Sequence, residues 1–277
     1  MKPVLHNLHT HTFRCKHATG DVDDYCRAAL DAGLECIGIS DHTPLPDDRW
    51  LSVRMPYVEL PDYMDAISEA QSDHPNLRIL RSAECEYDEC YESYYREEML
   101  GEYACDYLIG AVHFFPHQGE WLTPFSDFTN PSCYGSFTDY FIETMESGLF
   151  SFIAHPDNFG ASIPMMNAET EACTHAMCQA AVDLGGIWEV NGYGYRKTLD
   201  SSFSSRRNPY PIEEFWDIVS DYPIKVIANS DAHRPQDIAS NIDDALDLIN
   251  RKGLELASLD EVLARSPNAP KHLEREH

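Results

Sequence analysis

The chain has 277 residues, of which 43% are hydrophobic, so it is long and apolar enough to fold around a sizeable core. A formal net charge of −27 argues against nucleic acid as a partner, and no apolar run approaches the ~20 residues of a membrane span. The nine cysteines include no C-x-x-C pair, and the chain enters its first apolar run without a signal-like region. Together these features predict a cytoplasmic protein without a disulfide framework.

Short apolar runs alternate with helix-like stretches along the whole chain. We predict strands at 4–8, 36–40, 77–83, 107–112, 150–154, 187–190 and 224–228. We predict helices at 21–32, 62–71, in an acidic stretch ending near 99, and at 136–146, 168–184, 212–220, 243–251 and 259–265. The strand runs are nearly continuous in apolar residues, which is typical of a parallel sheet buried on both faces. Units of this kind predict one α/β domain over residues 1–277, a closed or nearly closed TIM-barrel-like fold.

Side chains that bind metals recur where the predicted strands end. They are His9 and His11 with His17 soon after, Asp41 and His42, Glu84 and Glu86, His113, His155 and Asp157, Glu189 and Asn191, and Asp231 and His233. In a parallel barrel the carboxyl ends of the strands meet at the end that holds the active site. A buried cluster of such groups must bind metal or bear a large free-energy cost for its charge. The pattern therefore predicts a metal centre at this end.

The first motif, His9-Thr10-His11, would direct both imidazoles to one side of a strand, because side chains alternate. Nine such ligands are too many for one ion, since zinc takes about four ligands. The set suits two or three divalent ions with Glu84 as a bridge, and its mixture of donors does not distinguish Zn, Fe and Mn.

Taken together, these motifs resemble the PHP family (polymerase and histidinol phosphatase domain). The family's ordered pattern is H-x-H, H, D-H, E, H, H and D-x-H, and it is met here by His9-Thr10-His11, His17, Asp41-His42, Glu84, His113, His155 and Asp231-Ala232-His233. The segments 40–46, 54–56, 59–63, 109–114, 189–191, 196–197 and 210–211 are similar to those of stand-alone histidinol-phosphate phosphatases. Departures from that subgroup are Ser82-Ala83 before Glu84, the aromatic-rich stretch 192–195 and the long loop 114–133.

The resemblance implies a distorted (β/α)7 barrel with a trinuclear metal centre. In the family's arrangement, His9, His11, Glu84 and Asp231 would hold one metal, Glu84, His113 and His155 the second, and His17, His42 and His233 the third. The implied activity is the hydrolysis of L-histidinol phosphate to L-histidinol and phosphate, a step of histidine biosynthesis.

The predicted reaction is metal-assisted hydrolysis by a phosphoric monoester hydrolase. Bound cations would also give this anionic protein a locally cationic pocket for a small anionic phosphate ester. Arg196 is the first candidate for the phosphate, because a guanidinium matches phosphate geometry, and Arg54 and His42 are further substrate-binding candidates. Asp231 and His233 are the catalytic candidates, since a ligand-shell Asp or His could protonate the leaving alkoxide. A water molecule is the alternative proton donor.

Other functions remain open at this point. A phosphoesterase on the same scaffold could act on nucleotides, sugar phosphates or phosphotyrosine. The lack of basic patches argues against an exonuclease or proofreading module, and the full ligand set argues against a non-catalytic metal-binding protein. A metal-dependent amidohydrolase often has a bridging lysine, and no lysine follows a predicted strand in that way. The sequence leaves the oligomeric state open.

Overall fold

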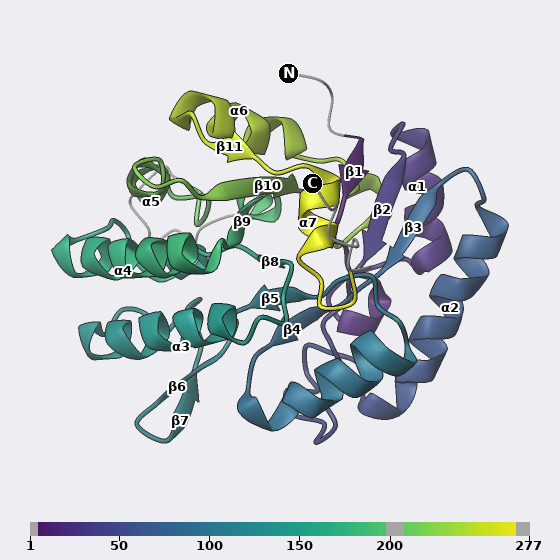
Figure 1. Ribbon diagram of the computed structural model, residues 1–277, viewed down its shortest axis with the longest axis horizontal. Helices are drawn as coiled ribbons and strands as arrows, with labels where there is room; N and C mark the ends of the chain where they lie inside the picture. The colour runs from purple at the N-terminus through teal and green to yellow at the C-terminus, as the bar shows by residue number, and fades with distance from the viewer. Residues whose placement is uncertain (1–4, 198–207, 270–277) are drawn as a thin grey trace, which may run out of the picture.

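Parallel strands form a barrel that is surrounded by helices (Figure 1). The computed structural model describes residues 5–197 and 208–269. One parallel sheet consists of β1 (His6–Asn7), β2 (Cys36–Ile39) and β3 (Arg78–Arg81). A second parallel sheet, in the order β11-β10-β9-β8-β5-β4, consists of β4 (Glu84–Glu86), β5 (Ile109–Ala111), β8 (Phe152–Ile153), β9 (Ile187–Asn191), β10 (Lys225–Asn229) and β11 (Glu255–Leu256).

Backbone hydrogen bonds join the two sheets at both seams. Beside β2, the amide of Thr43 donates to the carbonyl of Glu84 (2.8 Å), and the amide of Glu84 donates to the carbonyl of Asp41 (3.0 Å). Beyond the ends of β1 and β10, the amide of His11 donates to the carbonyl of Ala232 (2.9 Å). The ring therefore closes through isolated bridges near its carboxyl end rather than through full ladders. This architecture confirms the expected distorted (β/α)7 barrel.

Helices cover the outside of the strands (Figure 1). They are α1 (Val22–Asp31), α2 (Leu60–Asp73), α3 (Tyr134–Glu146), α4 (Ala168–Leu184), α5 (Glu213–Val219) and α6 (Ile242–Lys252), while a further helix, α7 (Leu259–Ala264), lies at one end of the ring. Helix α1 begins with a capping box, in which the Asp21 side chain accepts hydrogen bonds from backbone amides of the first turn and the Asp24 side chain accepts one from the Asp21 amide. The helix is followed by Gly33, whose φ of +76° turns the chain away. Such local signals explain why the predicted helix positions agree with the structure to within a few residues.

Apolar side chains from the strands fill the inside of the barrel. This inner cluster consists of Leu8, Cys36, Leu80, Tyr107, Ile109, Ala111, Phe152, Ala154, Ile187, Ile227, Ala257 and Val262. Val262 belongs to α7, which lies across the ring in Figure 1. Strand β11, which precedes α7, pairs with the first residues of β10, so α7 covers the amino end of the barrel. The carboxyl end is left as the end that can hold a site.

One predicted helix has an unusual geometry. The acidic stretch after β4 forms a short 3₁₀ turn, η3 (Glu89–Tyr91), and then a π-helix, η4 (Tyr94–Glu102). The amide of Tyr103 donates to the carbonyl of Glu98 (2.8 Å), five residues earlier. Buried side chains at 94 and 99, and again at 95 and 100, are also five residues apart, so the wider turn brings all four to one face.

Two other segments differ from the prediction. The run expected at 77–83 contains β3, and the chain then forms a separate strand that was not expected, β4, which belongs to the other sheet. The long loop 114–133 contains an antiparallel hairpin of β6 (Phe115–His117) and β7 (Glu120–Leu122), which alternation alone did not reveal. The hairpin stands beside the carboxyl end of β5 and so helps to shape the site described below.

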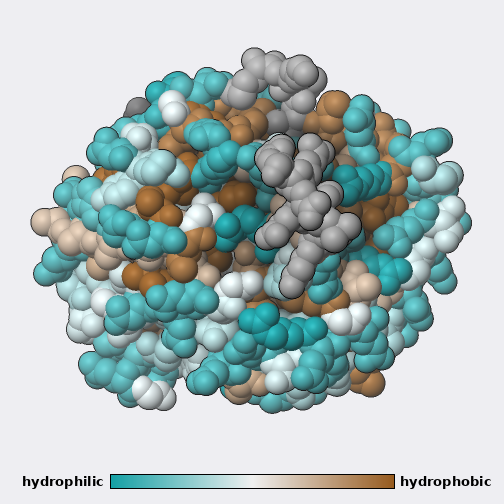
Figure 2. Space-filling model, viewed as in Figure 1, coloured by the Kyte–Doolittle hydropathy of each residue, from teal (hydrophilic) through white to brown (hydrophobic). Residues whose placement is uncertain are grey.

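Hydrophilic residues dominate the rim of the molecular face seen in Figure 2. This is the surface expected of a chain with a formal net charge of −27. Within the residues that the structure describes, no helix combines the length and apolar character needed to cross a membrane.

Candidate metal centre

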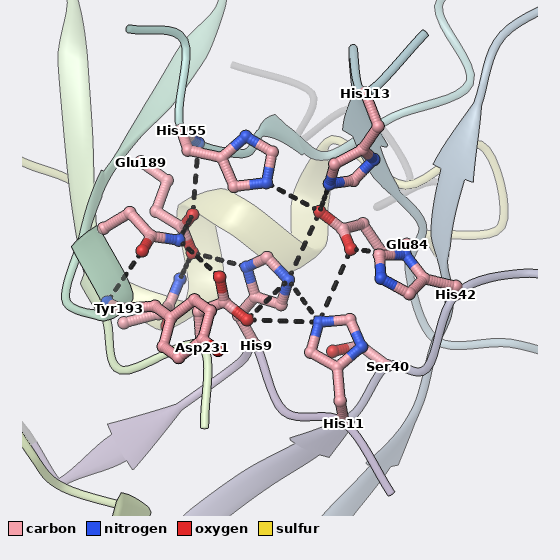
Figure 3. A network of polar contacts seen from close by, with 12 residues as sticks. His9, His11, Ser40, His42, Glu84, His113, His155, Glu189, Tyr193 and Asp231 are labelled. Atoms are coloured by element: carbon pink, nitrogen blue, oxygen red, sulfur yellow. Dashed lines mark hydrogen bonds and ion pairs between the residues drawn. The ribbon is translucent and has the colours of Figure 1, made fainter. Parts of the chain in front are cut away.

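The carboxylate of Glu84 lies at the centre of the candidate site (Figure 3). Glu84 is the first residue of β4 and is buried, and its carboxylate contacts imidazoles from four other strand ends. Its Oε1 lies 3.0 Å from His155 Nε2 and 3.4 Å from both His9 Nε2 and His113 Nε2; its Oε2 lies 3.0 Å from His42 Nδ1 and 3.4 Å from His11 Nε2. One carboxylate thus joins five of the predicted ligands.

The first predicted ligand group is closely assembled. The Nε2 atoms of His9 and His11 are 3.1 Å apart, and both face Oδ1 of Asp231, at 3.7 and 3.2 Å. His9, His11 and Glu84 offer ligand atoms that all lie within 4.8 Å of one another. His9 and His11 point to the same side of the chain after β1, as strand alternation predicts.

Two further clusters of ligand atoms, which overlap the second and third predicted groups, share the imidazole of His42. His42, Glu84 and His113 form one cluster of ligand atoms within 4.8 Å, and His155 joins it through its contact with Glu84. His17, His42 and His233 form another cluster with the same limit. The nine side chains predicted from the sequence therefore all meet at the carboxyl end of the barrel.

The atoms at this site fit divalent cations. Oε2 of Glu84 and Oδ1 of Asp231 are buried and receive no hydrogen bond from any described residue, although imidazole nitrogens surround them. Burial alone would raise the pKa of Glu84, but the neighbouring imidazoles, chiefly His113 and His9, hold it well below its ordinary value. Charged carboxylates among imidazoles are the mixed nitrogen and oxygen donors that Zn, Fe and Mn accept.

The third group consists of neutral imidazoles. Burial, followed by the nearby His11, lowers the pKa of His17 to about 4. Burial and His11 also hold the pKa of His42 and of His233 well below the ordinary value, against the opposing effect of the carboxylates. Neutral imidazole is the form that binds metal, so these histidines are prepared for ligation.

A second layer of polar groups orients the imidazoles. Nδ1 of His9 lies 2.8 Å from the carboxylate of Glu189, and Nδ1 of His113 lies 2.6 Å from that of Glu86. Nδ1 of His17 lies 2.7 Å from the carbonyl of Cys15. Each contact occupies Nδ1 and leaves Nε2 for a metal, which is the usual arrangement around ligating histidines.

Two acidic strand-end residues that the sequence grouped with the ligands have other roles in the structure. Asp41 accepts from the amide of Thr12 (3.0 Å) and from its hydroxyl (2.5 Å), and so holds the loop that follows His11. Asp157 accepts from the amide of Ile212 (2.6 Å) and from the indole of Trp216 (3.0 Å), and so ties this strand end to α5.

A cavity of about 330 Å³ opens onto the metal ligands. The wall facing the ligands, which we call the substrate wall, consists of Val53, Arg54, Phe114, Thr123, Phe125, Tyr193, Lys197 and Tyr210. Arg54 is fully buried, and its guanidinium donates to the carbonyl of Thr43 (2.9 Å) and lies 3.6 Å from the carboxylate of Glu86. The cavity thus has the ligand cluster on one side and an aromatic surface with two cationic side chains on the other.

The predicted role of Arg196 as a phosphate ligand does not fit this geometry. Arg196 is not among the residues that line the cavity. Its guanidinium donates to the carbonyls of Ser230 (2.7 Å), Asp231 (3.2 Å) and Ser240 (3.0 Å). Backbone oxygens therefore engage both terminal nitrogens of the guanidinium, and the side chain is directed at the backbone rather than at the cavity.

The neighbouring Lys197 faces the cavity in its place, and the sequence reasoning missed it. Its Nζ lies 4.6 to 5.0 Å from the ring centroids of Phe125, Tyr193 and Tyr210. Burial lowers the pKa of Lys197, while Asp231 and Glu84 act in the opposite direction. Arg196 and Lys197 stand side by side in the sequence, and no periodic pattern tells which one faces the site.

Comparisons with known proteins agree with these motifs. A family model described as the PHP domain matches residues 7–192. A relative from Deinococcus radiodurans named "probable histidinol-phosphatase" is 30% identical over 259 residues, covering 90% of this chain and 94% of the relative. A relative from Schizosaccharomyces pombe with the same name is 22% identical, covering 91% of this chain and 87% of the relative.

A solved structure has the same fold. It is a histidinol phosphate phosphatase from Lactococcus lactis in complex with zinc, L-histidinol and phosphate, and it matches with a TM-score of 0.68. The two sequences are 16% identical, and the match covers 93% of this chain and 97% of that one. The shared fold, the family model and the Deinococcus relative lead to one conclusion: this chain belongs to the PHP domain family.

Proposed function

We propose that this protein is a metal-dependent phosphatase that hydrolyses L-histidinol phosphate to L-histidinol and inorganic phosphate. The single observation that carries the proposal is the buried Glu84 carboxylate with imidazoles from five histidines around it, at the floor of a cavity. The names of the Deinococcus and yeast relatives support the choice of ester.

The nine ligands would hold two or three divalent ions, in the three groups that the family resemblance implies. His9, His11, Glu84 and Asp231 would form one site, Glu84, His113 and His155 the second, and His17, His42 and His233 the third. When bound, such ions lower the pKa of water and polarise the phosphoryl group. The Lactococcus structure is a complex with zinc, and the nitrogen and oxygen donors of this chain suit Zn, Fe and Mn.

Arg54 and Lys197 are the residues that we assign to the phosphate. Both carry a positive charge into a cavity that is otherwise lined by rings and metal ligands. The carboxylate of Glu86 and the carbonyl of Thr43 fix the guanidinium of Arg54, so it is positioned before a substrate arrives. His42 lines the same cavity and stays a candidate for contact with the ester.

Asp231 and His233 are the residues that we assign to proton transfer. Burial would raise the pKa of Asp231, but His9 and His233 hold it well below its ordinary value, so its carboxylate is ionised. In our scheme the oxygen of the attacking water bonds to phosphorus as the bond between phosphorus and the ester oxygen breaks. A proton of that water passes to the leaving alkoxide, with Asp231 and His233 beside the path.

The rest of the substrate would meet the aromatic side of the substrate wall. Phe114, Phe125, Tyr193 and Tyr210 offer ring faces to the imidazole and to the cationic amine of histidinol. We further propose that residues 1–277 act as one domain, in the cytoplasm, without a nucleic-acid partner.

Metal analysis with steady-state kinetics tests the proposal. We expect purified protein loaded with Mn, Fe or Zn to prefer L-histidinol phosphate over sugar phosphates, nucleotides and phosphotyrosine by more than about tenfold in kcat/KM. A much smaller preference would favour another PHP phosphoesterase. Cleavage of single-stranded DNA in the same assay would favour a nuclease, and bound metal without any hydrolysis would favour a non-catalytic role.

A further inference from the structure

Asp231, one of the proposed metal ligands, has a backbone conformation that needs external support. It directly follows Ser230 beyond the end of β10, it is buried, and its φ is +49°, in the left-handed region that non-glycine residues rarely adopt. A residue in such a conformation persists only where its surroundings hold it. The hydrogen bonds to Asp231 therefore identify the groups that keep this ligand in place.

Asn191 holds the side chain of Asp231. It is the last residue of β9 and is fully buried. Its Nδ2 donates to Oδ2 of Asp231 (3.1 Å) and to the carboxylate of Glu189 (2.7 Å). Because Oδ2 is fixed in this way, Oδ1 of Asp231 is turned toward His9 and His11.

The same amide also fixes the start of a short helix, η7 (Tyr193–Arg196). Oδ1 of Asn191 accepts from the amides of Tyr193 (2.8 Å) and Gly194 (3.4 Å). The ring of Tyr193 stacks on the imidazole of His233, with centroids 4.4 Å apart and planes 14° apart. Asn191 thus connects a metal ligand to the segment that supplies Tyr193 to the substrate wall.

Arg196 holds the other end of this helix against the backbone of Asp231. Its Nη2 donates to the carbonyls of Ser230 (2.7 Å) and Asp231 (3.2 Å). Its Nη1 donates to the carbonyls of Gly192 (3.2 Å) and Ser240 (3.0 Å). The next residue is Lys197, so the anchoring of Arg196 also determines where that ammonium lies.

We propose that Asn191 and Arg196 are positioning residues that clamp Asp231 from its side chain and from its backbone, and couple it to the segment carrying Tyr193 and Lys197. This inference deepens the proposed function and rests on it for the role of Asp231 as a ligand. Arg196 then acts on catalysis through the metal centre, whereas Lys197 acts on the substrate.

Metal titration of the whole protein tests the clamp without any substrate. Metal-free wild type, Asn191→Ala, Arg196→Met and Lys197→Met are titrated with Mn²⁺ and with Zn²⁺ by calorimetry. Arg27→Met is the matched control, because its guanidinium is exposed and, among the described residues, pairs with Asp23 one turn away. Hydrogen exchange at the amides of Tyr193 and Gly194 reports on the anchored helix.

We expect Asn191→Ala and Arg196→Met to bind their weakest metal at least about tenfold less tightly than wild type. The amide hydrogens of Tyr193 and Gly194 should also exchange faster in these two variants. Lys197→Met and Arg27→Met should retain wild-type metal affinity. At saturating metal, Arg196→Met should keep its inhibition by inorganic phosphate within about threefold of wild type. Wild-type metal affinity together with strongly weakened phosphate inhibition would overturn the clamp and restore Arg196 as a phosphate ligand.

Two features keep the test decisive. If circular dichroism shows that Arg196→Met does not fold, Arg196→Lys and Asn191→Ala carry the same expectation, and wild-type metal affinity in both would overturn the proposal. Failure of the proposed function is a separate result, because a protein that ignores L-histidinol phosphate can still lose metal affinity when Asn191 or Arg196 is changed.

Discussion

The two sides of the cavity are built in different ways. On the ligand side, most imidazoles come from strand ends, and buried carboxylates fix two of the rings: Glu189 fixes His9 and Glu86 fixes His113. On the substrate wall, Phe114 and Phe125 come from the loop that contains the β6–β7 hairpin and are only partly buried. The ligand side is therefore rigid and intolerant of change, and the wall is the side where specificity can vary.

The two sides also differ in how many metal ligands a single side chain contacts. Glu84 contacts five histidines at once, so a change there disturbs several ligands together. Phe125, by contrast, contacts Lys197, His113 and Tyr210 through its ring. Substitutions on the two sides should differ in size and in the quantity that they change: metal binding on the ligand side, and substrate affinity on the wall.

The largest effect is expected at Glu84. Glu84→Ala removes the one carboxylate shared by five imidazoles, so kcat/KM should fall by more than about a thousandfold and at least one metal should be lost. Elemental analysis and kinetics on L-histidinol phosphate check both effects. Glu120→Ala, at an exposed position on β7, is the control. Full metal content in Glu84→Ala would argue against its bridging role.

A smaller loss is expected at Glu86, outside the ligands. Glu86→Gln weakens the contact that fixes Nδ1 of His113 and the ion pair with Arg54, so metal affinity should fall about tenfold. Chelator competition measures this affinity, with the exposed Glu89→Gln as the control. Unchanged metal binding would mean that His113 needs no carboxylate to orient it.

A change at Lys197, on the substrate wall, should affect phosphate binding rather than metal binding. Lys197→Met keeps most of the unbranched side chain and removes the ammonium that faces the cavity, so the inhibition constant of inorganic phosphate should rise about tenfold while metal affinity stays constant. Lys225→Met, at the amino end of the barrel, is the control. Loss of metal in Lys197→Met would show that the two sides are not separable.

The smallest effect is expected at Phe125. Phe125→Ala removes one of three rings around the ammonium of Lys197 and part of the aromatic surface, so KM for the ester should rise about threefold, with kcat and metal content unchanged. Thermal unfolding should barely change, because the ring is only partly buried. A large fall in kcat would instead give this loop a part in arranging the ligands.

The prediction from sequence worked best where chemistry follows a strand directly. Continuous apolar runs located the strands, and the residue types after them located the ligands, because every strand of a parallel barrel ends on the same side. It worked least well at Ser82-Ala83, where the chain passes from β3 in one sheet to β4 in the other. It also missed the hairpin in the loop 114–133, which depends on contacts that no local pattern encodes.

Arg196 and Lys197 illustrate the limit most clearly. Both are basic, both lie in one motif, and the preference of guanidinium for phosphate favoured Arg196. The structure turns Arg196 toward the carbonyls of Ser230 and Asp231 and turns Lys197 toward the rings. Which neighbour faces the cavity depends on the path of β10 and its loop, about 35 residues further along the chain.

The barrel, the family and the nine candidate ligands could all be predicted from the amino-acid sequence, because strand patterns and ligand chemistry are local properties that repeat at the strand ends. The groups that surround those ligands could be identified only from the folded chain. Glu189, Asn191 and Arg196 act across strands, and the hydrogen bonds that give them their roles exist only after distant segments have come together. The same holds for the substrate wall, whose rings meet Lys197 only in the folded barrel.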